Sequence, residues 1–142
     1  MKYYSLPLLA MVVLFSPLAF SLDEPITIIA NPSLTVSHLS LDEVRDIYLL
    51  HDRQWSDSTQ IVVINRPSGS EIRSRFEQKI LGIAAKKYAL HLERLHYQGV
   101  TLPVIQESTQ AVIAFVQNVP GAIAYIEGSP NNKRVKVLMV LK

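Results

Sequence analysis

Cysteine is absent from all 142 residues, which excludes disulfide bonds and thiol chemistry. A lipid anchor attached to a cysteine is excluded as well. Stability must therefore come from an ordinary apolar core, and 49% hydrophobic residues suffice to build one. Net charge is also scarce, because 14 Lys and Arg against 12 Asp and Glu leave only +2. The short basic groups at 86–87 and at Lys133, Arg134 and Lys136 are interpreted as solvated surface, so we expect no nucleic-acid partner.

Common catalytic and metal-binding motifs are missing too. The sequence has no phosphate-binding P-loop and no Gly-x-Ser-x-Gly nucleophile elbow. His91 and His96 are five positions apart, about 140° around a helix, so they would not ligate one metal ion. His51 and Asp52 stand in a polar, turn-like stretch that is typical of a surface. We therefore expect no enzyme activity, no metal site and no cofactor.

Charged residues are nearly absent from the first 21 positions. Lys2 precedes an almost wholly apolar run over 6–20, and Ala19 and Ser21 place small residues where a signal peptidase cleaves. The alternative is a permanent membrane anchor. The run, however, is interrupted by two prolines and is shorter than the ~20 apolar residues that span a membrane. The pattern predicts an exported protein with a signal peptide over 1–21, a mature domain over 22–142 and no stable membrane insertion.

Strand and helix patterns alternate along the mature chain. Continuous apolar runs predict strands over 26–29, 61–64, 122–126 and 135–141, with a short extended segment over 102–105. Apolar residues at helical spacing predict helices over 41–48, 72–80 and 84–97, and a fourth that begins at Ser108 or Thr109 and ends before Pro120. Ser40 and Glu43 form a capping-box motif, and Gly82 is the expected end of the second helix. Strands separated by helices predict a single α/β domain with a mixed sheet.

The segment best suited to bind a ligand is Arg66-Pro67-Ser68-Gly69-Ser70, between the strand over 61–64 and the helix over 72–80. Ligands of open α/β sheets collect at the carboxyl ends of strands, beside helix N-termini that attract anions. Arg66 can bind phosphate, sulfate or carboxylate through its fork of donors, and Gly69 lets a ligand approach the backbone. The hydroxyls of Ser68 and Ser70 can donate further hydrogen bonds.

A plainer interpretation is that Ser68 or Ser70 only caps the helix and that Arg66 is a surface charge. Spacing alone favours this interpretation, because Ser-Gly-Ser is common before a helix. Glu71 also disfavours an anion, since its carboxylate occupies the first helical turn. Arg73 and Arg75 offset that charge only if they turn toward the same end of the helix.

Taken in order, these pieces resemble one family. The matching residues are 31–33, 39–48, Trp55, Arg66 with Gly69 and Ser70, Phe76, 81–82 and 120–125. The pattern is similar to the periplasmic substrate-binding protein of the phosphate ABC transporter, and more closely to its short, single-domain relatives. The resemblance covers about 26–141. It implies a fold like one lobe of a type II periplasmic binding protein, located in the periplasm.

In full-length members of this family, two lobes hold phosphate through a segment reading Arg-x-Asp-Gly-Ser-Gly-Thr. Arg66, Gly69 and Ser70 stand where that segment has its Arg, Gly and Ser, so the resemblance implies that these three contact the anion. With the hydroxyl of Ser68 added, the expected anion contacts are Arg66, Ser68, Gly69 and Ser70. Ser68 stands in place of the Asp, and Glu71 and Ile72 stand in place of the following Gly and Thr. A hydroxyl donor is thereby lost and a negative charge gained.

The function implied by the resemblance is binding of a small oxyanion, with phosphate as the first candidate, for phosphate uptake or sensing. One lobe cannot enclose a ligand, so a second copy or another envelope protein is expected to complete the site. The alternative is a lobe that has lost its ligand and acts as a protein-interaction module of the envelope. An exposed apolar patch near Ile72 or Trp55 would support this alternative.

Overall fold

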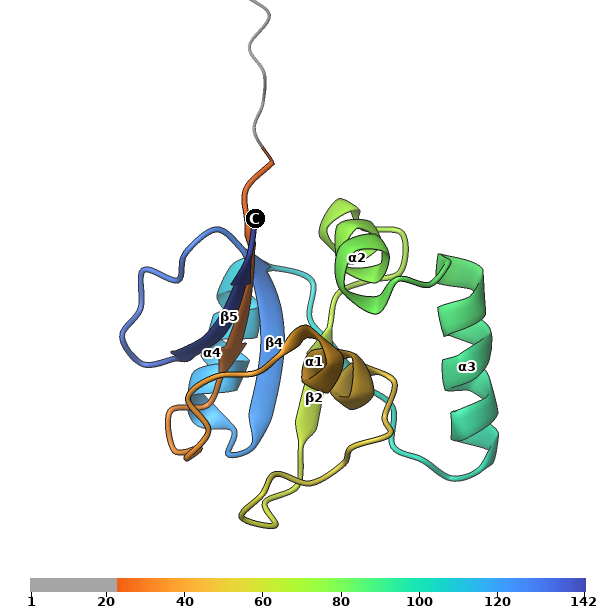
Figure 1. Ribbon diagram of the computed structural model, residues 1–142, viewed down its shortest axis with the longest axis horizontal. Coiled ribbons are helices and arrows are strands. Elements are labelled where there is room, and N and C mark those ends of the chain that lie inside the picture. Colours follow the sequence, from red (N-terminus) through yellow and green to blue (C-terminus); the bar gives the residue numbers. More distant parts are fainter. Residues whose placement is uncertain (1–22) are drawn as a thin grey trace, which may run out of the picture.

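The computed structural model describes residues 23–142, so the expected signal peptide lies outside the described residues. Five strands form one sheet in the order β3-β2-β4-β1-β5 (Figure 1). They are β1 (Ile26–Ala30), β2 (Val62–Asn65), β3 (Val104–Ile105), β4 (Ala122–Glu127) and β5 (Lys136–Leu141). β2 is parallel to β3 and β4, whereas β1 is antiparallel to β4 and β5. The predicted α/β class with a mixed sheet is confirmed.

Helices cover both faces of this sheet. α1 (Leu41–Tyr48), α2 (Glu71–Phe76) and α3 (Ala85–Tyr97) lie on one face, and α4 (Thr109–Asn118) lies on the other (Figure 1). α2 continues directly into a π-helical segment, η1 (Glu77–Leu81), so the second predicted helix consists of two parts. Gly82 ends it as expected, with φ of 64° and its amide bonded to the Glu77 carbonyl at 2.8 Å.

Alternating side chains of the central strands supply two separate cores. Ile28 and Val63 face the core beneath α1, α2 and α3. Ile29 and Ile64 face the core beneath α4, where they meet Val112. Because both faces are covered, the central strands are apolar at nearly every position. This is why the sequence of β2 shows no alternation between apolar and polar residues.

Two helix N-termini are capped as the sequence predicts. Ser40 Oγ accepts the amide of Glu43 at 3.2 Å, and the Glu43 carboxylate accepts the amide of Ser40 at 2.7 Å, which completes the capping box. The hydrogen bond from the Ser40 amide lowers the pKa of the Glu43 carboxyl. Ser108 Oγ accepts the amide of Ala111 at 3.1 Å and caps α4.

The carboxyl ends of four strands and the start of β1 lie at one end of the sheet. β2, β3 and β4 are parallel, so their carboxyl ends lie together. In the antiparallel register, Ile26 is opposite both Glu127 and Leu141. The start of β1 and the end of β5 therefore lie at this same end of the sheet, which is the upper end in Figure 1.

The basic group near the C-terminus is only partly solvated. Lys133 and Arg134 are exposed as expected. Lys136 is not, because its Nζ donates to the carbonyl of Val36 at 3.0 Å and to that of Leu34. Its side chain thus fastens the loop after β1 to β5.

No helix in the described part of the chain is long and apolar enough to cross a membrane.

Candidate functional site

Arg66 directly follows β2 and is buried, with 9% of its surface exposed. Its Nη2 donates to the carbonyl of Glu107, in the loop between β3 and α4, at 2.8 Å. Its Nε and Nη1 are buried and have no acceptor within residues 23–142. Arg66 is therefore not a surface charge, and that part of the plainer interpretation is wrong. A buried donor without an acceptor costs free energy, so an acceptor that reached Nε and Nη1 would stabilise the protein. An anion is such an acceptor, and Arg66 therefore has the properties of an anion-binding residue.

The backbone of Arg66 is anchored on both sides of the residue. Its amide donates to Asn65 Oδ1 at 2.8 Å and also lies 3.3 Å from Tyr125 Oη. Its carbonyl accepts a hydrogen bond of 2.9 Å from Arg73 Nη1. Tyr125 Oη in turn donates to Asn65 Oδ1 at 2.5 Å. Groups from β2, β4 and α2 thus fix the point where the chain leaves the sheet.

Tyr48, Tyr88 and Tyr125 are buried beside this anchor. Tyr88 Oη donates to the carbonyl of Tyr48 at 3.0 Å, and Tyr48 Oη donates to the carbonyl of Ile64 at 2.9 Å. Burial raises the pKa of all three phenols above its ordinary value, since a phenolate would lose its hydration. The three side chains therefore remain neutral hydrogen-bonding groups at physiological pH.

Arg73 serves the structure instead of a ligand. Its Nε lies 2.7 Å from Glu77 Oε1, with side-chain exposures of 8% and 5%. Its guanidinium also lies 5.6 Å from the centre of the Tyr88 ring. Because Glu77 already balances its charge, Arg73 does not offset the exposed carboxylate of Glu71.

Arg75 is turned toward the start of the described chain. It donates to the carbonyl of Glu24. Its guanidinium lies 3.9 Å from the carboxylate of Asp23 and 4.0 Å from that of Glu127. Neither arginine of α2 is thus free to neutralise Glu71.

The turn after Arg66 is open. Ser68 and Gly69 are exposed, and Gly69 has φ of 81° with no atom within 4 Å of the place where a Cβ would stand. Ser70 occupies the N-cap position of α2, but its hydroxyl donates to the Pro67 carbonyl at 2.7 Å and caps nothing. The capping interpretation is therefore wrong for Ser70. A ligand can approach the backbone here, as the sequence suggests, but the Ser70 hydroxyl already has a partner.

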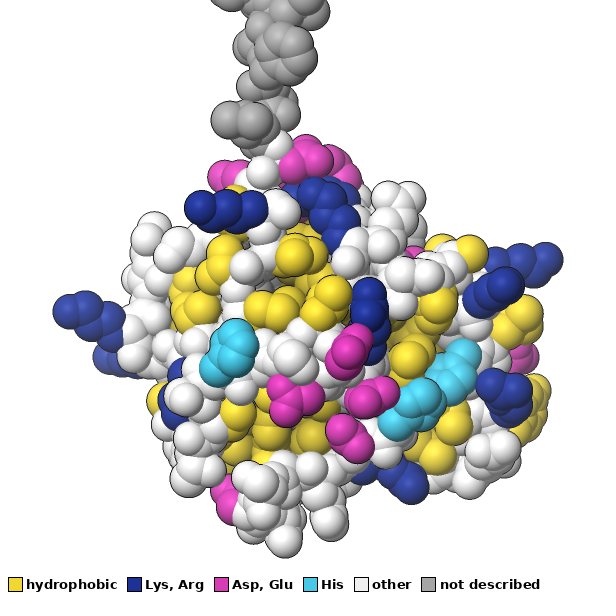
Figure 2. Space-filling model, viewed as in Figure 1, with side chains coloured by type: hydrophobic (Ala, Val, Ile, Leu, Met, Phe, Trp, Pro, Cys, Tyr) yellow, Lys and Arg dark blue, Asp and Glu magenta, His cyan; other side chains and the backbone are white. Residues whose placement is uncertain are grey.

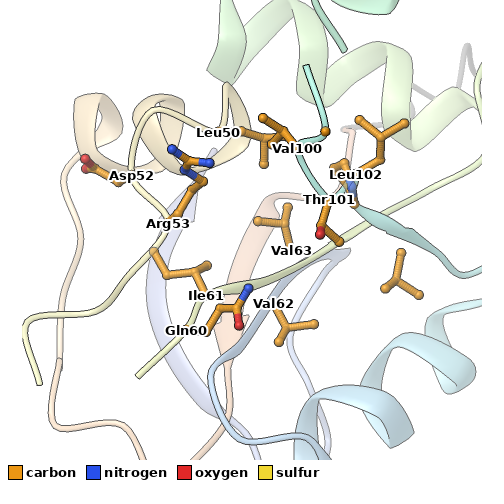
Figure 3. A pocket seen from close by; sticks show the side chains of 13 residues that line it. Leu50, Asp52, Arg53, Gln60, Ile61, Val62, Val63, Val100, Thr101 and Leu102 are labelled. Atoms are coloured by element: carbon orange, nitrogen blue, oxygen red, sulfur yellow. The ribbon is translucent and has the colours of Figure 1, made fainter. Parts of the chain in front are cut away.

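A separate pocket of about 200 Å³ lies at the opposite end of β2 (Figure 3). Apolar side chains form much of its lining, including Val63, Val100 and Leu102, while Asp52 and Arg53 lie at one side. Its residues come from the amino ends of β2 and β3 and from the loops that precede them. It is therefore distinct from the end of the sheet that carries Arg66.

The histidines do not assemble a metal site. His91 lies close to His51, with ring centres 5.9 Å apart, and its Nε2 is 2.7 Å from the carbonyl of Leu49. Across residues 23–142, no group of three or more His, Asp or Glu side chains could hold a metal ion. On the face in Figure 2, acidic side chains gather over α1 with a basic side chain beside them, and the other basic side chains are scattered toward the edges. This face therefore carries no continuous basic patch.

The two residues beside which the sequence suggested an exposed apolar patch are themselves buried. Ile72 is 5% exposed and Trp55 is 8% exposed, so both belong to the core. Trp55 Nε1 donates to the carbonyl of Gly121 at 3.0 Å, which ties the loop before β2 to the start of β4.

Sequence reasoning missed the groups that hold Arg66. Arg73 and Glu77 are four positions apart, and this spacing is a recognisable signal for an ion pair on one helix face. Tyr125 lies in a fully apolar strand, where a buried hydroxyl must find a partner. No local signal indicated Glu107, which is 41 residues from Arg66 in sequence.

No protein-family model matches the sequence, and no curated protein matches it. Several solved structures do. One from Clostridium perfringens, described as a phosphate ABC transporter substrate-binding protein with bound phosphate, has a TM-score of 0.66 and 25% identity, over 81% of this chain and 44% of that one. An ABC-type phosphate transport receptor from Vibrio cholerae has a TM-score of 0.64 and 17% sequence identity, and the match covers 82% of this chain and 46% of that one. PstS from Borrelia burgdorferi has a TM-score of 0.66 and 17% sequence identity, and the match covers 81% of this chain and 46% of that one.

The chain therefore spans less than half the length of each of these structures and matches one domain of them. The resemblance that the sequence suggested is confirmed. So is the expected fold class, a single lobe of a two-lobed binding protein.

Proposed function

We propose that this chain, which shares its fold with one domain of the phosphate transporters' substrate-binding proteins, is a non-enzymatic binding protein for a small oxyanion. Phosphate is the first candidate, and the process served is phosphate uptake or sensing in the periplasm. The observation that carries the proposal is Arg66. This buried arginine stands at the carboxyl end of a central strand, with two nitrogens that lack an acceptor in the described chain.

The neighbouring turn completes the proposed contacts. Arg66 contributes the positive charge and donors that a tetrahedral oxyanion needs. Gly69 leaves the backbone open, and the exposed Ser68 offers a hydroxyl. Ser70 joins only if its hydroxyl releases the Pro67 carbonyl.

Binding requires a local movement. The Nε and Nη1 atoms of Arg66 are covered by neighbouring groups, so no solvent reaches them. Either those groups move aside, or the guanidinium leaves the Glu107 carbonyl and swings toward the exposed turn at Ser68 and Gly69. A ligand that satisfies these donors would stabilise the folded protein through mass action.

We expect weak affinity. One domain leaves the ligand open to water on one side, and the Glu71 carboxylate repels an anion at the start of α2. These features suggest a dissociation constant from tens of micromolar to millimolar, about 4 to 6 kcal/mol of binding free energy. A second copy or another envelope protein that covers the open side would tighten the complex.

Export through a signal peptide is part of this proposal. Expression of the full chain in a Gram-negative bacterium, followed by mass spectrometry of the periplasmic fraction, tests it. The expected product begins at Leu22, whereas a protein that retains residues 1–21 in the membrane fraction contradicts cleavage.

Calorimetric titration of the chain from Leu22 with phosphate, and then with sulfate, tests binding. We expect saturable heat from the unmodified chain and none from Arg66→Ala. Arg53→Ala is the matched control, because it removes an exposed arginine at the other end of β2. No heat with either anion at several millimolar would overturn the proposal, and so would equal binding by Arg66→Ala and the unmodified chain.

A further inference from the structure

We propose that the N-terminus of α4 supplies a second set of donors to the anion site. One oxyanion would then be held between Arg66 and the first-turn amides of Thr109 and Gln110. This inference rests on the proposed function, because it takes Arg66 to be an anion-binding residue. It applies to the first of the two movements above, in which the guanidinium stays at the Glu107 carbonyl and the neighbouring groups move aside. It adds a helix end that neither the sequence motif nor the resemblance identifies.

The sheet brings Arg66 to the start of α4. In the parallel pairing of β2 and β3, Asn65 is opposite Ile105, and the Gln106 amide donates to the Asn65 carbonyl at 3.0 Å. The chain therefore leaves both strands at the same level. The Arg66 side chain then reaches Glu107, whose carbonyl accepts Nη2 at 2.8 Å. Glu107 directly precedes Ser108, the N-cap residue of α4.

Arg66 provides evidence independent of the helix end itself. About nine-tenths of its surface is buried, and its Nε and Nη1 lack acceptors within residues 23–142. The guanidinium is therefore a cation with unused donors, held by its third nitrogen beside the N-terminus of a helix. Both features favour the same kind of ligand, namely a small anion.

The first turn of α4 has donors to offer. The amide of Ala111 is bonded to Ser108 Oγ at 3.1 Å, and the amide of Val112 to the Ser108 carbonyl at 3.0 Å. The amides of Thr109 and Gln110 precede the first intrahelical bond and have no acceptor in the described chain. The Thr109 hydroxyl adds a further possible donor.

α4 suits an anion better than α2 does. α4 has ten residues and no acidic residue in its first turn. α2 has six residues before it becomes η1, and Glu71 occupies its first turn. The Glu107 side chain is the acidic group nearest to the start of α4 in sequence, and it is exposed, so water and salt screen its charge.

Two substitutions of Thr109 distinguish the contribution of its amide to anion binding from that of its hydroxyl. Proline is well tolerated at the first position of a helix, and Ser108 has φ of −124° and ψ of 154°, a conformation that suits a residue before proline. Thr109→Pro removes both donors, whereas Thr109→Val removes only the hydroxyl. Ala85→Pro makes the same backbone change at the first position of α3 and is the matched control.

Phosphate titration of these variants, each checked for thermal unfolding, tests the inference. We expect Thr109→Pro to bind about tenfold more weakly than Thr109→Val, since the amide donates to a charged acceptor. Ala85→Pro should bind like the unmodified chain. Equal affinities for Thr109→Pro and Thr109→Val would overturn the role of the helix amides.

A charge variant tests the same helix end without a proline. Gln110→Glu places a carboxylate where the helix dipole favours it, so α4 is retained, but it repels the anion. We expect a severalfold loss of phosphate affinity at low salt, with no loss for Gln98→Glu, an exposed residue at the end of α3. Unchanged affinity in Gln110→Glu would count against the site. If the unmodified chain binds no phosphate, the proposed function fails; if only Arg66→Ala loses binding, this inference alone fails.

Discussion

Arg73 Nη1 donates a hydrogen bond of 2.9 Å to the main-chain carbonyl of Arg66. The same guanidinium pairs with Glu77, and both side chains are buried. A structural arginine thus holds the backbone of the arginine that we assign to the ligand. The α2 segment is fastened to the end of β2 through this contact.

Loss of the Arg73 charge should be costly. Arg73→Met leaves the Glu77 carboxylate buried without a partner, and we expect it to lower the free energy of unfolding by about 3 to 5 kcal/mol. The double variant Arg73→Met with Glu77→Met should recover much of this loss, because no buried charge remains. Urea denaturation of both variants measures the difference. A double variant no more stable than Arg73→Met would contradict this account.

Arg66 should behave in the opposite way. Arg66→Met removes a buried guanidinium that has two unsatisfied nitrogens, so we expect unfolding stability without ligand to change by less than about 1 kcal/mol or to increase. Phosphate should stabilise the unmodified chain against thermal unfolding and should not stabilise Arg66→Met. A large loss of stability in the absence of ligand would show that Arg66 is a structural residue.

Gly121 and Gly69 both have positive φ but differ in their surroundings. A Cβ at Gly121 would stand 2.1 Å from the carbonyl oxygen of Gln60, whereas nothing lies within 4 Å at Gly69. We expect Gly121→Ala to cost about 3 kcal/mol or more, because a backbone clash adds to the strain. Gly69→Ala should cost only the left-handed strain of about 1 to 2 kcal/mol. Thermal unfolding of the two variants tests this order, and equal losses would contradict it.

The buried tyrosines predict alkaline sensitivity. Burial raises the pKa of Tyr48, Tyr88 and Tyr125 in the folded state, so above about pH 10 the unfolded chain loses protons that the folded protein keeps. The stability contributed by these groups is fully present below about pH 10 and is lost as pH rises through the folded pKa values. Each tyrosine adds a slope of about 0.7 kcal/mol per pH unit near pH 10, which approaches about 1.4 kcal/mol per pH unit once the unfolded phenol is fully ionised.

Urea midpoints between pH 9 and pH 11 measure that slope. Tyr125→Phe should reduce it by about one third, since one of the three buried phenols is removed. Tyr97→Phe, at a side chain that is 83% exposed, is the control and should leave it unchanged. A slope that is the same in Tyr125→Phe and Tyr97→Phe would show that the buried phenols do not govern alkaline unfolding.

Local patterns determined most of the secondary structure. The apolar runs of β1, β2 and β4, the capping box of Ser40 and Glu43 and the stop at Gly82 all depend on residues a few positions apart, so they can be read along the chain. The position of the candidate site after β2 follows from the same order of elements. The π-helical end of the second helix had no such signal.

Tertiary structure alone decided how the arginines are used. The sequence shows Arg66, Arg73 and Arg75 as similar charges around one turn, but burial separates their roles. Arg73 is neutralised by Glu77, and Arg75 lies near acidic residues at the start of β1, although its Nε also lacks a hydrogen-bond acceptor. Arg66 has two nitrogens without acceptors and no acidic side chain paired with it in the described chain. The contact between Arg66 and Glu107 spans 41 residues and depends on the short pairing of β2 with β3. Composition and spacing determined which charges the chain carries, and only packing decided which of them remains free for a ligand.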